Sequence, residues 1–197
     1  MKATIVLIAN NEGENFGRKM MLRAHQAGGM GFEMARLPQH VSLKQPFIIP
    51  RLEKFEAFFD EFAKKINPVK IEFECIDTFP NTSLGGISSG VISLRVKETP
   101  ELKNAQKILF ENLNKEFGPC PAEHDDDYIF HMTIAIGGAP FENYERAEIA
   151  LNSNEEIIKE LNEQSYIFDK IGLLFYDDDN IVPGTYFCYK VADIKED

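Results

Sequence analysis

Two short segments of this chain share one arrangement of histidine, hydroxyl and apolar side chains, His40–Leu43 (HVSL) and His131–Ile134 (HMTI). Side chains of a strand alternate between its two faces, so each histidine should share a face with the hydroxyl two residues later. The apolar residues would then point into a core. Two imidazoles and two hydroxyls suit acid–base chemistry on a phosphate, because histidine titrates near neutral pH and hydroxyls can donate to phosphate oxygens.

The repetition of this pattern carries more weight than either segment alone. A histidine in a strand more often makes a structural hydrogen bond than it catalyses, and Ser or Thr is common in strands. The two histidines lie 131 − 40 = 91 residues apart, and they are two of the four in the chain. A repeat that served folding alone would need only the apolar positions. The repeated histidine and hydroxyl therefore favour a functional site.

The elements that would position these segments alternate along the chain. In addition to the first motif strand, we expect strands over 4–9, 69–75, 92–96, 128–136, 167–176 and 185–191, and helices over 14–27, 52–66 and 102–117. A polar helix or helix pair is expected over 141–164, and an acidic turn over 177–180 would join the last two strands. No Gly/Ser linker divides the chain, so we predict a single domain, 1–197, of two related α+β lobes.

The charge of the chain restricts its partners. The formal net charge is −11, and a protein this acidic repels the phosphates of a long nucleic acid. Both motifs nevertheless lie in acid-free windows. Residues 34–52 contain no acidic residue but include Arg36, Lys44 and Arg51, and residues 128–141 contain no Asp, Glu, Lys or Arg. This distribution favours a small phosphorylated nucleotide or the end of an RNA as the ligand.

Composition excludes several other classes of protein. The apolar run Ile5–Ala9 is too short to span a membrane. Three cysteines without a CxxC pair argue against a disulfide framework or a structural zinc site and favour a reducing compartment. No P-loop, G-x-G-x-x-G, G-x-S-x-G or H-E-x-x-H motif occurs. We therefore expect a soluble, cytoplasmic protein, monomeric and without a membrane partner.

Other polar residues are weaker candidates. Lys44 has the strand parity to share the face of His40, so it is either a phosphate ligand or a solvated lysine. The segment His124–Asp127 suggests a metal site, but consecutive loop residues cannot easily converge on one ion, so we interpret it as a solvated acidic loop. His25 has no chemical partner in the sequence and is interpreted as structural. Four aromatic residues are either base-stacking or core residues: Tyr128, Phe130, Phe175 and Tyr186.

The paired segments resemble the H-x-[S/T]-x signatures of the 2H phosphoesterase superfamily, which includes the LigT-like (2′-5′ RNA ligase-like) proteins and RNA cyclic phosphodiesterases. The layout is also similar, with Pro38 and Pro46 flanking the first motif. The resemblance implies a bilobed α+β fold, in which two pseudo-symmetric lobes of antiparallel sheet with flanking helices surround a central cleft. The two motif strands would face each other there, one from each lobe.

The same resemblance implies an activity. Such proteins hydrolyse 2′,3′-cyclic or related phosphodiesters without a metal or another cofactor. Carried over to this chain, it makes His40 and His131 the general base and acid, and Ser42 and Thr133 the phosphate-binding residues. We expect His40 to be the base and His131 the acid, because the three basic residues near the first motif should disfavour protonation of His40.

Two alternatives remain open at this level. The same pocket could bind a nucleotide or an RNA end without turnover, although a pure binding module has less need of two titratable groups. A metal-dependent hydrolase could use both histidines and nearby carboxylates, and the acid-free windows count against it. Turnover in EDTA would favour the metal-independent enzyme over the binding module, and metal bound to the purified protein would favour the metal-dependent hydrolase.

Overall fold

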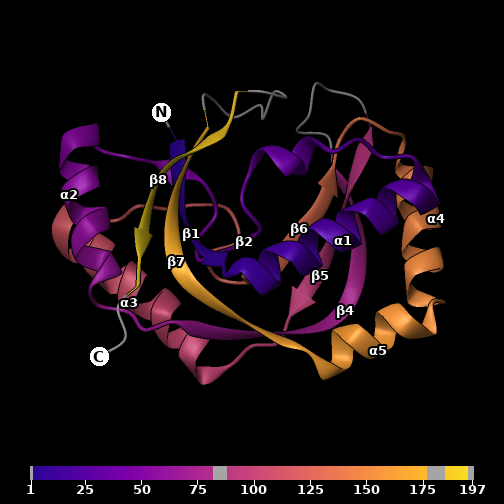
Figure 1. Cartoon of the computed structure of the whole chain (residues 1–197). Coiled ribbons are helices and arrows are strands. Elements are labelled where there is room, and N and C mark those ends of the chain that lie inside the picture. The colour runs from indigo at the N-terminus through magenta and orange to yellow at the C-terminus, as the bar shows by residue number, and fades with distance from the viewer. Residues whose placement is uncertain (1, 82–87, 177–184, 195–197) are drawn as a thin grey trace.

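Strands and helices alternate along the described residues of the computed structural model, 2–81, 88–176 and 185–194 (Figure 1). The strands are β1 (Lys2–Ala9), β2 (His40–Ser42), β3 (Phe47–Ile48), β4 (Val69–Asn81), β5 (Ser89–Val96), β6 (His131–Ile136), β7 (Ser165–Tyr176) and β8 (Phe187–Asp193). The helices are α1 (Asn11–Gly28), α2 (Leu52–Ala63), α3 (Pro100–Phe117), α4 (Phe141–Asn152) and α5 (Glu155–Glu163), with a short 3-10 helix η1 (Glu33–Arg36). The acidic turn expected over 177–180 lies outside the described residues.

One antiparallel sheet connects both halves of the chain, in the order β2-β1-β7-β4-β5-β6. Strand β3 also pairs with β1, and β8 pairs with β7. The long strand β4 joins the two parts, because Val69–Glu72 pairs with β7 and Phe73–Asn81 pairs with β5. The motif strands β2 and β6 stand at opposite ends of this order, yet they contact each other, so the sheet curves back on itself. The predicted α+β fold with an antiparallel sheet and flanking helices is confirmed.

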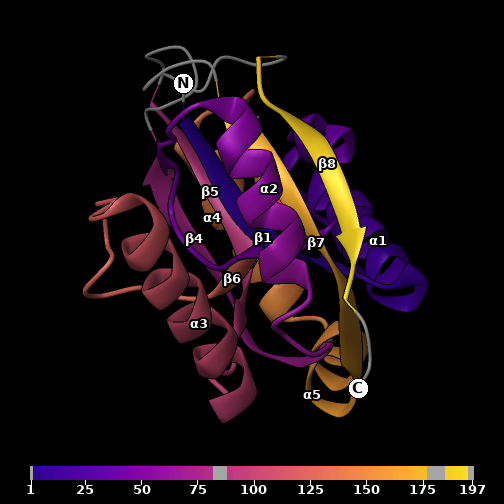
Figure 2. The same ribbon diagram turned by 90° about the vertical axis from the view of Figure 1, so that its left-hand side faces the viewer.

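Two helices also bring the N-terminal and C-terminal halves of the chain into contact. Helix α1 follows β1 but packs against α4 and β6. Helix α3 follows β5, but its Phe117 packs against Phe55 and Phe58 of α2, on the other side of the molecule (Figures 1 and 2). The second motif strand thus lies close to a helix from the first half of the sequence. Gly17 allows α1 to approach the first motif, because an added Cβ there would overlap the Gln39 side chain.

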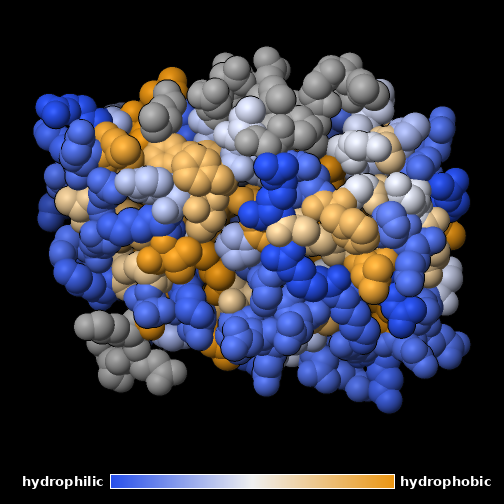
Figure 3. All heavy atoms as spheres, turned by 45° about the horizontal axis from the view of Figure 1, so that its top comes forward, coloured by the Kyte–Doolittle hydropathy of each residue, from blue (hydrophilic) through white to orange (hydrophobic). Residues whose placement is uncertain are grey.

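The surface is mainly polar on the face shown in Figure 3, with apolar side chains gathered over β8 on its left. The exposed residues of β8 include Phe187, Tyr189 and Val191. Among the residues that the structure describes, no helix is both long and apolar enough to cross a membrane.

Candidate active site

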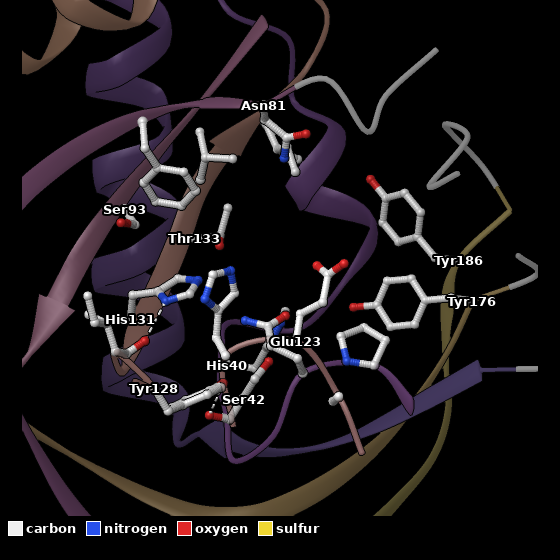
Figure 4. Close-up of a pocket in the computed structure, with 18 of the residues that line it drawn as sticks. His40, Ser42, Asn81, Ser93, Glu123, Tyr128, His131, Thr133, Tyr176 and Tyr186 are labelled. Carbon is white, nitrogen blue, oxygen red and sulfur yellow. Dashed lines mark hydrogen bonds between the residues drawn. The ribbon is translucent and has the colours of Figure 1, made fainter. Parts of the chain in front are cut away.

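The four motif residues with polar side chains line one cleft of about 1270 Å³, where β2 and β6 face each other (Figure 4). His40 and Ser42 enter from β2, and His131 and Thr133 enter from β6. The apolar residues between and after them, Val41, Leu43, Met132 and Ile134, are at most 1% exposed. The alternation predicted for both strands is therefore confirmed, and the structure brings all four predicted residues together.

The two imidazoles are oriented in the same way. Nδ1 of His40 lies 2.8 Å from the carbonyl oxygen of Pro38, and Nδ1 of His131 lies 2.9 Å from that of Ile129. A carbonyl can only accept a hydrogen bond, so each Nδ1 carries a hydrogen and each Nε2 is left for proton exchange. In each case the acceptor is two residues before the histidine, which repeats the pattern of the motif itself.

Burial lowers the pKa of both histidines below the ordinary value, because a charged imidazole loses its hydration in the cleft. For His40, the hydrogen bond to Pro38 raises the pKa, the charge of His131 lowers it and the carboxylate of Glu14 raises it. For His131, the hydrogen bond to Ile129 raises the pKa, Arg95 lowers it and Asp77 raises it. Both imidazoles are thus biased toward the neutral form.

The neighbours of the second motif are polar. In the pairing of β5 with β6, Ser93 stands opposite Thr133 and Arg95 opposite His131, so their side chains share one face. Both Ser93 and Arg95 line the cleft. Neither residue was predicted from the sequence. Alternation predicted their strand, but nothing in the sequence indicates that this strand pairs with β6, so no signal marked them.

The neighbours of the first motif are apolar. In the pairing of β1 with β2, Val6 stands opposite Ser42 and Ile8 opposite His40. Val6 is 0% and Ile8 5% exposed. The first motif therefore depends on its own two polar side chains, without a polar partner on the adjacent strand.

Lys44 does not reach the cleft. Strand β2 ends at Ser42, so the alternation that placed Lys44 on the face of His40 does not continue to it. Its side chain is 2% exposed and forms an ion pair with Asp125, and the ammonium lies 4.4 Å from the centre of the Phe110 ring. Both interpretations offered for this residue, a phosphate ligand and a solvated lysine, therefore disagree with its position.

The other two basic residues of the first window are also paired with carboxylates. Arg36 lies 3.8 Å from Glu33, and the exposed Arg51 lies 3.7 Å from Glu53. The expectation of a positive field at His40 is therefore wrong, because each of the three cations of that window is paired with a carboxylate. The cation that acts on a catalytic candidate is Arg95, beside His131.

The acidic loop is only partly solvated. Asp125 binds Lys44 and accepts a hydrogen bond from the backbone N–H of Ala122 at 2.9 Å. His124 and Asp127 form a local pair at 3.1 Å between the imidazole and the carboxylate, and both side chains are exposed. No group of three or more potential metal ligands occurs within residues 2–81, 88–176 and 185–194.

The four aromatic residues singled out in the sequence divide between the cleft and the core. Tyr128 and Tyr186 line the cleft together with Tyr176, whereas Phe130 and Phe175 are core residues, 2% and 6% exposed (Figure 4). The Tyr128 hydroxyl donates a hydrogen bond of 2.8 Å to the backbone oxygen of Ser42, which links the segment before β6 to β2.

His25 lies outside the cleft. Its Nδ1 is 2.6 Å from the Met30 carbonyl oxygen, and its ring packs against Phe32. This environment agrees with the structural role expected for it.

Comparison with known proteins identifies the fold. The chain is similar to TT0787 of Thermus thermophilus, with 13% identity, 98% of each chain covered and a TM-score of 0.61. It is also similar to E. coli LigT complexed with NADP+, with 13% identity, 99% of this chain and 98% of that chain covered and a TM-score of 0.54. LigT complexed with phosphate has 12% identity, the same coverage and a TM-score of 0.51. None of the curated proteins compared with this chain matches it.

A family model gives the stronger result, because it matches the sequence itself. The model of the 2′-5′ RNA ligase superfamily matches residues 22–180, which include both motifs and most of the chain. Together with the paired histidine motifs and the curved antiparallel sheet, this match shows that the chain belongs to the 2′-5′ RNA ligase superfamily of 2H phosphoesterases.

Proposed function

We propose that this protein is a metal-independent phosphodiesterase that opens a 2′,3′-cyclic phosphate on a nucleotide or at an RNA end. Family membership supports a phosphoesterase-type function. The observation that carries the proposal is the matched orientation of the two imidazoles, each bound through Nδ1 to a backbone carbonyl and open at Nε2. The complexes of LigT with 3′-AMP, NADP+ and phosphate support a nucleotide ligand for the cleft.

The proposed reaction is one displacement at phosphorus. A water molecule attacks the phosphorus while the general base takes its proton, and the bond from phosphorus to one ribose oxygen breaks. The general acid donates a proton to that oxygen, which leaves as a hydroxyl. Ser42 and Thr133 donate hydrogen bonds to the non-bridging oxygens, where negative charge grows in the transition state. No other co-reactant is needed.

The surroundings of the histidines support His40 as the base and His131 as the acid. His40 is buried, 8% exposed, whereas His131 is of intermediate exposure. The repulsion between two charged imidazoles is mutual, so it favours one proton on the pair, and the greater exposure of His131 favours that residue as its site. The assignment therefore rests on burial, and no longer on the basic residues of the first window.

Hydrolysis of adenosine 2′,3′-cyclic phosphate in EDTA tests this proposal. We expect His40→Ala and His131→Ala each to lower kcat by about 10²–10⁴-fold, the usual contribution of a general acid or base. His25→Ala is the matched control, because His25 also binds a backbone carbonyl through Nδ1 but lies outside the cleft. Full activity in both cleft variants would overturn the site. Loss of wild-type activity in EDTA would overturn metal independence, and binding of 3′-AMP without turnover would support the non-catalytic module instead.

A further inference from the structure

The guanidinium of Arg95 is a cationic group in the cleft that the proposed reaction does not use. Arg95 stands opposite His131 across the β5–β6 pairing, and its side chain is 41% exposed. Its terminal nitrogen binds the carboxylate of Asp77. Asp77 is on β4, directly opposite Ser93 of β5. Asp77, Ser93 and Arg95 all line the cleft. Arg95 is therefore held at the cleft wall by a carboxylate while remaining accessible to a ligand.

One donor of this guanidinium has no partner. The Nε of Arg95 is buried and makes no hydrogen bond with any residue that the structure describes. A buried donor without a partner costs free energy, so such a group calls for an explanation. Because Nε itself is closed to solvent, the donors that a ligand oxygen can reach are the terminal nitrogens of this side chain, which is 41% exposed. The planar guanidinium, with several donors in a fixed fork, matches the oxygens of a phosphate.

The position of Arg95 separates it from the reacting phosphate. That phosphate would lie between the Ser42 and Thr133 hydroxyls, on the strands β2 and β6 that face each other. Arg95 is on β5, one strand farther from β2, which is a step of about 4.8 Å. This separation allows Arg95 to bind a second phosphate of the same nucleotide while the two hydroxyls hold the cyclic phosphate.

The size of the cleft allows a second anionic group. Its volume of about 1270 Å³ exceeds the roughly 300–1,000 Å³ of pockets that hold a drug-sized ligand. Arg95 shares the cleft wall with Asp77, so it would attract an anion through the donors that Asp77 does not occupy. Room and charge thus coincide beside His131.

We propose that Arg95 binds the 5′-phosphate of the nucleoside whose 2′,3′-cyclic phosphate lies between the two motif strands. This inference rests on the proposed function and narrows its substrate. The 5′-phosphate can be a terminal monoester, or it can be the diester that joins the last nucleoside to the preceding one. Both sources offer the same oxygens, and both distinguish the ligand from a simple cyclic mononucleotide.

Three substrates test the proposal: adenosine 2′,3′-cyclic phosphate, its 5′-phosphorylated form, and the dinucleotide ApA ending in a 2′,3′-cyclic phosphate. The wild type should have a kcat/KM about tenfold or more higher for the two substrates with a 5′-phosphate, the scale of a charge-assisted hydrogen bond. Arg95→Gln should remove most of this preference. Arg95→Lys should restore part of it, because lysine keeps the charge but not the fork.

Lys97→Gln is the matched control. It removes the same charge two residues along the chain, from a lysine that pairs with Glu72 and does not line the cleft. The control should keep the preference for a 5′-phosphate. An equal loss on all three substrates in Arg95→Gln would overturn the proposal, and so would an unchanged preference. A preference for the dinucleotide alone would also overturn it, because that result assigns recognition to the additional nucleoside.

A binding measurement separates this inference from the proposed function. Titration calorimetry compares 3′-AMP with adenosine 3′,5′-bisphosphate on the wild type and on Arg95→Gln. The additional 5′-phosphate should tighten binding about tenfold in the wild type only. If no cyclic phosphate is hydrolysed but this difference is found, the proposed function fails and the role of Arg95 stands. If hydrolysis occurs and the difference is absent, the proposed function stands and the role of Arg95 fails.

Discussion

The two motif strands carry the same pattern but have opposite kinds of neighbour. Opposite the first motif, β1 presents the buried apolar residues Val6 and Ile8. Opposite the second motif, β5 presents Ser93 and Arg95, which line the cleft. An apolar neighbour adds burial and keeps an imidazole neutral, whereas a polar neighbour adds groups that can bind a ligand. The pseudo-symmetric motifs are thus made unequal by the strands beside them.

The largest expected difference between the two sides is in stability. Ile8→Ala should lower the free energy of unfolding by about 2–5 kcal/mol, because it removes buried methyl groups from a well-packed position. Arg95→Ala should cost less, about 1 kcal/mol, because its ion pair with Asp77 is partly exposed to solvent, with side chains 41% and 29% exposed. Urea unfolding measures both variants. Equal losses would show that β1 and β5 support their motifs in the same way.

The next largest effect is expected for Lys44→Ala, a variant that tests whether Lys44 supplies charge to the first motif. Lys44→Ala should lower the free energy of unfolding by roughly 3 kcal/mol or less, since the loss expected for a fully buried pair is reduced by the 22% exposure of Asp125. The KM for a cyclic phosphate should not change. Lys64→Ala is the control, because its ion pair with Glu61 is exposed and should contribute little. A raised KM in Lys44→Ala alone would return this residue to the phosphate site.

The sequence was sufficient for the parts of the site that depend on local periodicity. Alternation along a strand places His40 with Ser42 and His131 with Thr133, and it needs no knowledge of other strands. The same rule failed for Lys44, because β2 ends before it. Strand length is set by pairing with β1, which a local pattern does not contain.

The charge environment could not be predicted for a related reason. The basic window around the first motif was counted along the chain, but Lys44 pairs with Asp125, 81 residues away. The cation that does act on a histidine, Arg95, is 36 residues from His131 in sequence (131 − 95) and directly opposite it in the sheet. Electrostatic neighbours are decided by strand pairing, which is non-local.

A smaller effect should appear in the pH dependence of kcat/KM. The proposed reaction requires His40 as a neutral base and His131 as a protonated acid, so activity should fall below the pKa of His40 and above that of His131. Since burial lowers both, the active range should lie below that of two free imidazoles. Arg95→Gln removes a cation beside His131, so the pKa of His131 should rise and the alkaline limb should move to higher pH. Glu14→Gln removes an anion near His40, so the acid limb should move to lower pH.

Titration of the histidine ring protons by NMR gives the same pKa values without catalysis. Opposite movements of the two limbs would confirm that each histidine responds to its own neighbour. If Arg95→Gln moved the acid limb instead, the roles of base and acid would be exchanged. The two motif strands would still have different neighbours, but the apolar side would then hold the acid and the polar side the base.

The smallest expected effect concerns the link between the two strands. Tyr128→Phe removes the hydrogen bond from its hydroxyl to the Ser42 carbonyl but keeps the ring packed on Phe130. It should cost about 1 kcal/mol of stability and also lower kcat, because the spacing of the two motifs is then less fixed. Urea unfolding and hydrolysis rates measure these two quantities.

Tyr144→Phe provides the matched control for this link. The buried Tyr144 hydroxyl also donates to a backbone carbonyl, that of Gly137, but it lies outside the cleft. This variant should lose a similar amount of stability without losing kcat. If both variants kept full activity, the curved sheet alone would hold β2 against β6, and the tyrosine would add only stability. If only Tyr128→Phe lost activity, a single hydroxyl would join a motif with apolar neighbours to one with polar neighbours, and both would have to be held together for catalysis.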